Sequence, residues 1–377
     1  MSRINDLIKE MCPNGVEYVK LEELVEYIQP AKYIVKSTNY DIKYDVPVLT
    51  AGQTFILGYT NEKDGVYYAS ADNPVIIFDD FTTSNHWVDF NFKVKSSAMK
   101  ILISKTDNLF KYIYYCISNI DYVPKEHSRQ WIQVYSKFQI PLPPLKVQEE
   151  IVRILDKFGE LEAELEAELE ARKSQYEFWR GKLLNKKNNN YKKYNINEIC
   201  KSVSAGGDVP EDTIKGISKP QDDYKYPVIS NGVGENAIYG YSKNYRVDVQ
   251  SCVTIAARGT IGYHEVRYGK FTPIIRLITL IPDEKIISAK YLHYALYGHE
   301  FKPSGGGIPQ LTTPTVKQLD LIIPPVEEQN RIVGILDKFD KLVSNITDGL
   351  PAEIELRRKQ YEYYRNKLLN FEDIQYE

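Results

Sequence analysis

The sequence predicts an α+β protein with two pseudo-symmetric globular α/β domains separated by two long, antiparallel paired helices. Three observations predict this fold. The length of 377 residues suits two domains, each large enough to bury its own core. The second half of the chain repeats the first, and each repeat ends in a stripe of apolar residues with helical spacing. Hydrophobic residues at 43% and charged residues at 26% are typical of a globular protein.

The repeat consists of two blocks. Residues 142–158 match residues 323–339 at 10 of 17 positions, with an offset of 181. Residues 172–185 match residues 357–370 at 9 of 14 positions, with an offset of 185. Each pair of blocks follows about 140 less similar residues, so we expect two diverged domains on a duplicated scaffold. Shorter similarities keep the same order in both halves: 44–49 with 224–229, 58–60 with 240–242, and 112–115 with 291–294.

The repeated blocks are predicted to be a short strand followed by a long helix. Apolar strands at 138–142 and 319–323 end at Pro-Pro pairs, which cannot continue a sheet. Apolar residues then recur every three or four positions through 147–184, which predicts one helix roughly 57 Å long at 1.5 Å per residue.

The second helix should be interrupted where the first is continuous. Gly349 and Pro351 flank Leu350, a combination that kinks or breaks a helix. A narrow apolar stripe of this length needs a partner, and the other copy packed antiparallel is the nearest one. Two surface helices on separate domains are the alternative, which the length of the stripe disfavours.

Residues 160–171 are three tandem copies of Glu-Leu-Glu-Ala. Glutamate, leucine and alanine are all strong helix formers, so the repeat reads as a helical spacer with a solvated acidic face. Each copy adds about 6 Å and about 40° of net rotation. The domain boundaries predicted from these features are 1–146 for the first domain, 147–185 for the first helix, 186–193 for a linker, 194–327 for the second domain and 328–371 for the second helix.

Composition restricts the class of protein only loosely. The net charge is −3, and without the six glutamates of the repeat it becomes 48 basic against 45 acidic residues, or +3. The 30 tyrosines suit interfaces or base contacts, although an AT-rich genome also explains them. Four separated cysteines, no signal peptide and no long apolar run indicate a cytoplasmic protein with reduced thiols.

Catalytic motifs are absent from the sequence. It has no Asn/Asp-Pro-Pro-aromatic motif, no Gly-rich nucleotide loop and no Walker motif. The five histidines lack metal-ligand spacing. Asp79-Asp80 and Asp283-Glu284-Lys285 lack the flanking elements of a nuclease, so surface loops explain them better.

Polar loops between apolar strands are the candidate binding sites. In the second half, the strand 253–257 leads into Arg258-Gly259-Thr260-Ile261-Gly262, which reads as a tight turn that presents Arg and Thr. Arginine suits guanine, and hydroxyls suit phosphates, although a Gly turn beside a strand or a salt-bridged arginine is common. The polar side chains predicted to contact DNA in these and neighbouring loops are Gln53, Thr54, Thr82, Thr83, Ser84, Asn85, Arg129, Gln130, Lys243, Arg246, Arg258, Thr260, Ser304 and Gln310.

The chain resembles the specificity subunits of type I restriction-modification systems. The resemblance rests on residues 11–17 (MCPNGVE), the two P-P-x-x-x-Q helix starts, the two Q-Y-E-[FY]-[WY]-R-x-K-L-L helix ends and the 258–262 turn (RGTIG), in duplicated order over essentially the whole chain. It implies two target-recognition domains that read a bipartite, asymmetric double-stranded DNA site. It also implies that the helices bind two adenine methyltransferase subunits, which a restriction subunit can join. No cofactor is expected on this chain, which is then a non-catalytic subunit.

The partner-binding residues expected on the helices are Gln148, Tyr176, Trp179, Gln329, Tyr361 and Tyr364. Three alternatives stay open from the residues alone. They are a recognition subunit of another methyltransferase–nuclease assembly, a coiled-coil adaptor that binds only proteins, and a stand-alone nuclease or methyltransferase. The interruption at 349–351 departs from the family pattern and leaves the length and straightness of the second helix open.

Overall fold

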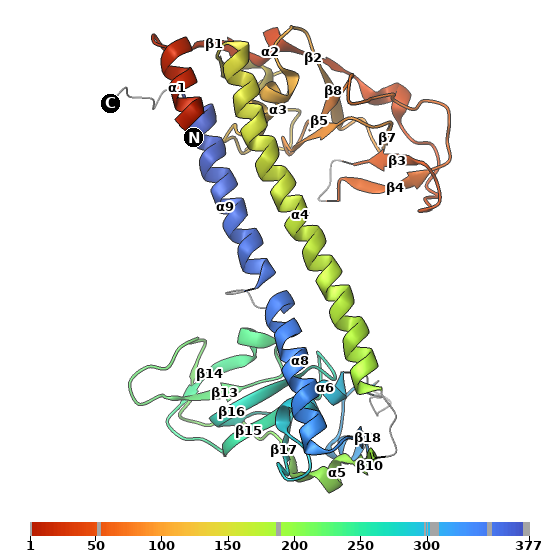
Figure 1. Cartoon of the computed structure of the whole chain (residues 1–377), viewed down its shortest axis with the longest axis vertical. Helices are drawn as coiled ribbons and strands as arrows, with labels where there is room; N and C mark the ends of the chain where they lie inside the picture. Colours follow the sequence, from red (N-terminus) through yellow and green to blue (C-terminus); the bar gives the residue numbers. More distant parts are fainter. Residues whose placement is uncertain are drawn as a thin grey trace. The chain divides into compact units, whose positions relative to one another are not determined.

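A computed structural model describes residues 2–50, 54–185, 190–297, 299, 301, 309–344 and 349–371. The chain divides into two compact units (Figure 1). Unit 1 comprises residues 1–166 and 353–377, and unit 2 comprises residues 167–352. Each unit combines β-sheet with helices, so the predicted α+β class is confirmed.

Unit 1 contains two principal sheets. The first has the order β2 (Val25–Ile28), β8 (Met99–Ser104), β5 (Val75–Asp79) and β6 (Asn85–Val88), and the second has β4 (Ile56–Thr60), β3 (Val46–Leu49) and β7 (Lys93–Val94). All five residues of β5 are buried, as expected for a β-branched and aromatic run in the centre of a sheet. Helix α3 (Phe110–Ser118) packs against this core, which also receives α1 (Ser2–Met11).

Unit 2 contains one seven-stranded sheet, built in the order β11 (Cys200–Ala205), β17 (Leu277–Pro282), β15 (Val247–Ala256), β16 (His264–Pro273), β13 (Tyr226–Ile229), β14 (Ile238–Ser242) and β12 (Ile214–Lys215). Helix α6 (Ala289–Leu296) contributes Tyr291 and Leu292 to the core beneath it. The short strands that precede each Pro-Pro pair form two-stranded sheets. In unit 1, β9 (Gln139–Leu142) pairs with β1 (Glu17–Lys20), and in unit 2, β18 (Asp320–Ile323) pairs with β10 (Lys192–Asn195).

The duplication extends into the diverged sheets. Strand β3 pairs with β4 through Val48↔Gly58, and β13 pairs with β14 through Val228↔Gly240. Both pairings shift register at the next residue. Strand β3 also pairs in parallel with β7, as β13 does with the end of β16. One long strand in unit 2, β16, therefore occupies the place of β6 and β7 in unit 1.

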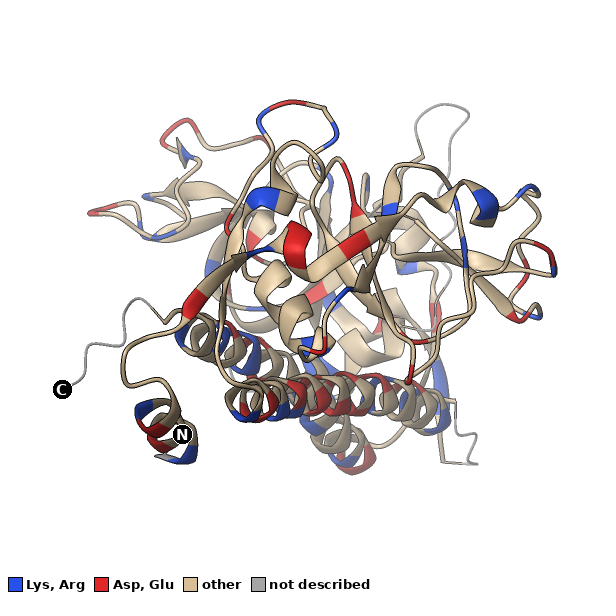
Figure 2. Cartoon of the chain, turned by 90° about the horizontal axis from the view of Figure 1, so that it is seen from above, with Lys and Arg blue, Asp and Glu red and all other residues tan. Residues whose placement is uncertain are grey.

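The long helices follow the sequence pattern closely. Helix α4 is continuous from Leu145 to Leu184, and the second copy consists of α8 (Val326–Ser344) and α9 (Leu350–Leu369). The predicted interruption is thus confirmed. Pro351 lies in the first turn of α9, where a missing N–H costs no hydrogen bond. Charged residues of both signs are spread along these helices (Figure 2).

Within unit 1, the start of α4 packs antiparallel to α9. Phe158 stacks on Tyr364 with 5.5 Å between ring centroids, and Glu162, one turn later on α4, pairs with Arg358, which lies earlier on α9. Within unit 2, Tyr176 near the end of α4 stacks on Phe339 of α8 at 6.1 Å. Phe158 and Tyr361 in one unit are the repeat equivalents of Phe339 and Tyr176 in the other, so both contacts derive from the duplicated blocks.

Equivalent contacts in the two units attach α3 and α6 to the long helices. Tyr115 of α3 donates a hydrogen bond to Asp156 of α4, and Tyr294 of α6 donates one to Asp337 of α8. A lysine from each short helix, Lys111 or Lys290, pairs with the same aspartate. Each globular domain is therefore fixed to its helix in the same way. None of the described helices combines the length and apolar content that crossing a membrane requires.

Candidate nucleic-acid interface

The loop after β5 in unit 1 is organised by Asp79. Its Oδ1 accepts from the backbone N–H of Phe81 at 2.8 Å, and its Oδ2 accepts from the Thr82 hydroxyl at 2.7 Å. Thr83 adopts a left-handed conformation with φ of 65° and is buried. Thr82 and Ser84 are exposed on either side of it. Of these three hydroxyls predicted to contact DNA, two are on the surface.

A buried ion pair ties a second loop to this one. Lys100 Nζ lies 3.3 Å from Asp80 Oδ2, and both side chains are almost completely buried. The other carboxylate oxygen of Asp80 accepts from the backbone N–H of Trp131 at 2.8 Å. The backbone carbonyl of Asp80 accepts from the backbone N–H of Gln130. Removing one member of such a pair costs about 3–5 kcal/mol because the other charge stays buried. Asp79 and Asp80 therefore hold loops in place, and because both are buried, the prediction that they lie on a surface loop is wrong.

Two further polar residues predicted to contact DNA in unit 1 have internal contacts instead. Gln130 is only 3% exposed, accepts from Tyr122 Oη and donates to Ser128 O at 2.7 Å. Asn85 is half-buried and accepts from Ser118 Oγ at 2.5 Å. Arg129, beside Gln130, is exposed and has no ion pair among the described residues. Arg129 is therefore a cation that this loop presents, together with the exposed Lys125.

In unit 2, Asn231 holds the loop after β15. Its side chain donates to the carbonyl of Arg258 at 2.5 Å, while its own carbonyl accepts from Thr260 Oγ1 at 2.8 Å. Gly259 and Gly262 have φ of 78° and 85°, so the predicted tight turn is present and uses the freedom of glycine. Thr260 is exposed at its tip and Arg258 is half-buried beside it. Asn231 lies 27 residues upstream of Arg258, so no local sequence pattern indicates this role.

Other predicted side chains lie on the surface of the same unit. Arg246 and Gln310 are exposed, and the backbone N–H of Leu311 donates to Ala257 O at 2.8 Å, which brings Gln310 next to the Arg258 turn. Neither Arg246 nor Arg258 has an acidic partner in the described part of the chain. Lys243 lies over the ring of Tyr224 and 3.8 Å from Asp223. Thr54 of unit 1 is exposed, whereas Gln53 and Ser304 lie outside the described residues.

The two glutamines expected to bind partners are internal. The side chain of Gln148 is 1% exposed, accepts from the N–H of Leu109 and donates to Pro143 O. The side chain of Gln329 is fully buried, accepts from the N–H of Ser288 and donates to Pro324 O. Each glutamine thus joins the start of a long helix to the residue before a short one. Neither side chain is available to a partner at the surface.

The aromatic residues predicted to bind partners are buried or half-buried. Tyr176 is buried under Phe339, and Tyr361 and Tyr364 are half-buried against Phe158. Trp179 is half-buried, with Lys182 Nζ 4.9 Å from its ring.

The residues preceding two of these aromatics had not been predicted as partner-binding. Phe178 on α4 and Tyr363 on α9 are 62% and 60% exposed. They occupy equivalent positions of the repeat, and each makes an edge contact with the next aromatic ring.

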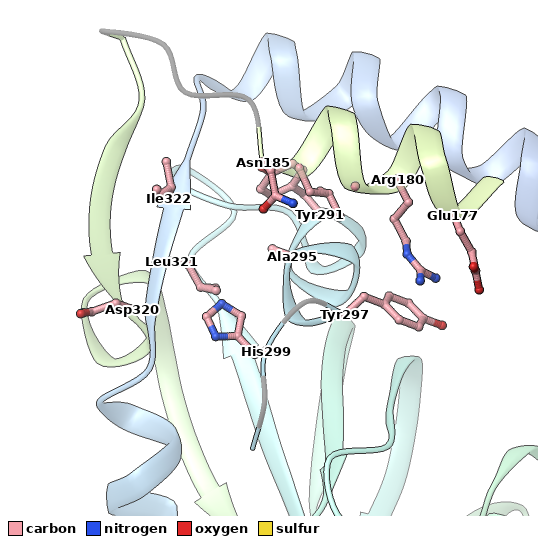
Figure 3. A pocket seen from close by; sticks show the side chains of 12 residues that line it. Glu177, Arg180, Asn185, Tyr291, Ala295, Tyr297, His299, Asp320, Leu321 and Ile322 are labelled. Atoms are coloured by element: carbon pink, nitrogen blue, oxygen red, sulfur yellow. The ribbon is translucent and has the colours of Figure 1, made fainter. Parts of the chain in front are cut away.

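Unit 2 also has a cavity of about 600 Å³ between the end of α4, α6 and β18 (Figure 3). Arg180 and Glu177 of α4 line one side, and Tyr297 and His299 line another. Arg180 stacks on the ring of Tyr297 at 4.6 Å. No three His, Cys, Asp or Glu side chains in the described ranges are grouped to hold a metal ion, and the four cysteines are free thiols. The cavity lies where the sheet domain joins the long helix.

Comparison with known proteins gives a consistent result. The family described as "Type I restriction modification DNA specificity domain" matches residues 13–171 and 188–356. The chain is 40% identical to the type I restriction enzyme EcoR124I/EcoR124II specificity subunit of Escherichia coli, over 98% of each protein. It is 32% identical to a protein of Haemophilus influenzae described as a type I restriction enzyme specificity subunit, over 94% of this chain and 96% of that protein.

Solved structures show the same fold. The S subunit of a type I restriction-modification system from M. genitalium superposes with a TM-score of 0.58 at 14% identity, covering 95% of this chain and 97% of the other. A chain from a structure on complex assembly and conformational transition of the type I restriction-modification system gives 0.53 at 15% identity, covering 95% and 98%.

Proposed function

The chain belongs to the type I restriction modification DNA specificity family, and we propose that its two units each read one half of a split double-stranded DNA sequence. The reading domains in this proposal are residues 1–146 and 194–327, and the adenine methylation is carried out by a separate partner subunit. The chain itself supplies recognition and no catalytic group.

One observation carries the proposal: equivalent loops are held by equivalent backbone bonds but present different side chains. The N–H of Gln130 donates to Asp80 O in unit 1, and the N–H of Leu311 donates to Ala257 O in unit 2, both at 2.8 Å. The loops anchored there carry the exposed Thr82, Ser84 and Arg129 in one unit, and the exposed Thr260 and Gln310 with the half-buried Arg258 in the other. A retained scaffold with exchanged loop side chains is what reading two different base sequences requires.

The charges of these loops fit an anionic ligand despite the net charge of −3. Arg129, Arg246 and Arg258 lie on loops without an ion pair in the described parts of the chain. Many acidic residues lie on the long helices instead, where Glu160, Glu168 and Glu170 are paired with nearby cations. Local charge therefore favours phosphate and base contacts at the loops.

Arg258→Ala tests the reading role in the complete complex with the methyltransferase. We expect discrimination at one base pair of one half-site to fall by roughly 1–3 kcal/mol, while the other half-site is read as before. Binding would be measured on DNA with single base-pair changes over a salt series, after adenine methylation has been mapped in the host genome. Lys285→Ala, at the far end of β17, is the control. An equal loss on all DNA would make Arg258 a phosphate contact, and a complex with no sequence preference would refute DNA reading altogether.

We also propose that Phe178 and Tyr363 anchor two copies of the methyltransferase subunit. Exposed aromatic rings are typical of interface hot spots, and a repeated chain presents the same anchor once in each unit. The equivalence of the two positions predicts two copies of one partner rather than two different partners.

Native mass spectrometry of the reconstituted complex tests this docking. Phe178→Ala should leave one bound partner copy, Tyr363→Ala should leave the other, and the double variant should bind neither at concentrations that saturate the parent. An aromatic anchor is worth roughly 2 kcal/mol or more. Glu177→Ala and Glu362→Ala, the preceding residues, should bind two copies. Two bound copies on the double variant would place the docking surface elsewhere.

A further inference from the structure

The turn between β16 and β17 in unit 2 carries a strained arginine. Arg276 has φ of 76°, a conformation that glycine adopts readily and a side chain with a Cβ does not. The preceding residue, Ile275, is 55% exposed, and the guanidinium of Arg276 has no ion pair among the described residues. A strained, exposed cation at this position stabilises nothing that the structure describes, so a ligand is the simplest reason for it.

The backbone of this turn is fixed from three directions. The N–H of Ile274 donates to Ile229 O at 2.9 Å, and the N–H of Gly206 donates to Leu277 O at 2.7 Å. The N–H of Ala257 donates to the carbonyl of Arg276 itself at 2.8 Å. Since Ala257 immediately precedes Arg258, the turn lies next to the loop assigned above to DNA reading. A rigid backbone beside that loop gives the Arg276 side chain a defined starting position.

Unit 1 has an equivalent turn, one residue longer and with different side chains. The N–H of Lys95 donates to Leu49 O at 2.8 Å, as Ile274 does to Ile229, and the N–H of Asp80 donates to Ala98 O at 2.9 Å, as Ala257 does to Arg276. Between these anchors unit 1 has Ser96 and Ser97, with Lys95 and Ser97 exposed. The two anchoring bonds are retained, whereas the side chains differ: Lys95 and Ala98 stand where unit 2 has Ile274 and Arg276, and two serines stand where it has Ile275.

We propose that residues 274–276 and 95–98 form a second sequence-reading loop in each unit, and that Arg276 contacts a base edge in the half-site read by unit 2. This inference rests on the proposed function. The guanidinium offers the paired donors that guanine accepts, and the exposed methyl groups of Ile275 suit the methyl group of thymine. The seryl and lysyl side chains of unit 1 would read a different base there, consistent with an asymmetric target.

Arg276→Gly separates reading from folding. Glycine keeps the left-handed backbone and removes only the side chain, so the melting temperature should stay the same or rise. In complex with the methyltransferase, the variant should lose roughly 10- to 100-fold discrimination at one base pair of the unit 2 half-site, with the unit 1 half-site unaffected. Arg276→Lys keeps the charge but not the paired donors and should lose most of the same discrimination. Lys285→Gly, at the opposite end of β17, is the matched control and should read the parent sequence.

The outcomes distinguish this inference from the proposed function. If the parent complex shows no sequence preference, the proposed function fails. If the parent reads a split site and Arg276→Gly reads it equally well, or loses affinity evenly on all DNA, the second reading loop is refuted while the proposed function stands. Loss confined to one base pair of one half-site supports it.

Discussion

At the scale of single residues, burial controls the chemistry of His293 in α6. Burial, together with the neighbouring His264, lowers the pKa of His293 to about 4. Its ring lies 4.9 Å from that of His264 and 5.1 Å from that of Tyr297. The Nδ1 atom is buried without a hydrogen-bond partner in the described structure. Protonation of His293 would therefore place a second charge-bearing N–H where nothing accepts it.

This predicts a loss of stability in mild acid. An unfolded histidine has a pKa of about 6.5, so between pH 6.5 and 4 the unfolded chain binds a proton that folded His293 does not. Stability should be unaffected by this group above pH 6.5 and should fall as the pH decreases below it. His293→Gln removes the titration, so the melting temperature should drop less between pH 7.5 and pH 5 than in the parent. Equal drops in thermal unfolding curves of the two proteins would contradict this account.

Residue roles were predictable where they depend on residue type, and unpredictable where they depend on burial or backbone angle. Arg258 and Thr260 reach the surface because they follow a strand in a glycine turn, which the sequence displays. Gln130 and Gln148 look equally polar in the sequence, but contacts with distant residues hold them inside. The N–H of Gln130 donates to Asp80 O, and the side chain of Gln148 accepts from the N–H of Leu109. Arg276 was not predicted because Ile-Ile-Arg reads as a strand continuation, and a φ of 76° leaves no mark on composition.

At the scale of elements, the long helices were predictable and the sheets were not. The helices follow from an apolar residue every three or four positions, and the break before α9 follows from Gly349 and Pro351, both local signals. Whether this region forms one long strand, β16, or two short ones, β6 and β7, depends on pairing with β13 or β3, which lie far away in the chain. Local pattern carries no information about such partners.

The short helices α3 and α6 connect the sheets to the long helices and hold them in a fixed position. Each uses a tyrosine and a lysine against one aspartate, Asp156 or Asp337, and each begins next to a buried glutamine. The two glutamines therefore link each short helix to the start of a long helix through hydrogen bonds, a role that their spacing in the sequence does not indicate. A loop can read a base sequence only if the domain that carries it is held in place. This explains why the contacts of the short helices are the same in both units while the loops differ.

At the scale of the whole molecule, the boundary between the two units lies inside the Glu-Leu-Glu-Ala repeat, between Glu166 and Ala167. Arg358 of α9 pairs with Glu162 and Glu166, both at 2.5 Å. Because the repeat has a period of four, removing residues 164–167 puts another glutamate four residues after Glu162, so both pairs can re-form. The deletion therefore changes the length of helix between the units without changing the residues on either side.

Deleting residues 164–167 should consequently alter only the gap between the two half-sequences. Four helical residues carry about 6 Å of rise and about 40° of rotation, which correspond to one or two base pairs of DNA. Mapping methylated adenines in cells that express the deletion variant with its methyltransferase should give the parent half-sequences at a gap shorter by that amount. Glu164→Gln, which keeps the helix length, should leave the gap as it is. A changed half-sequence would mean that the repeat belongs to a reading domain, and an unchanged gap would mean that helix length does not set the spacing.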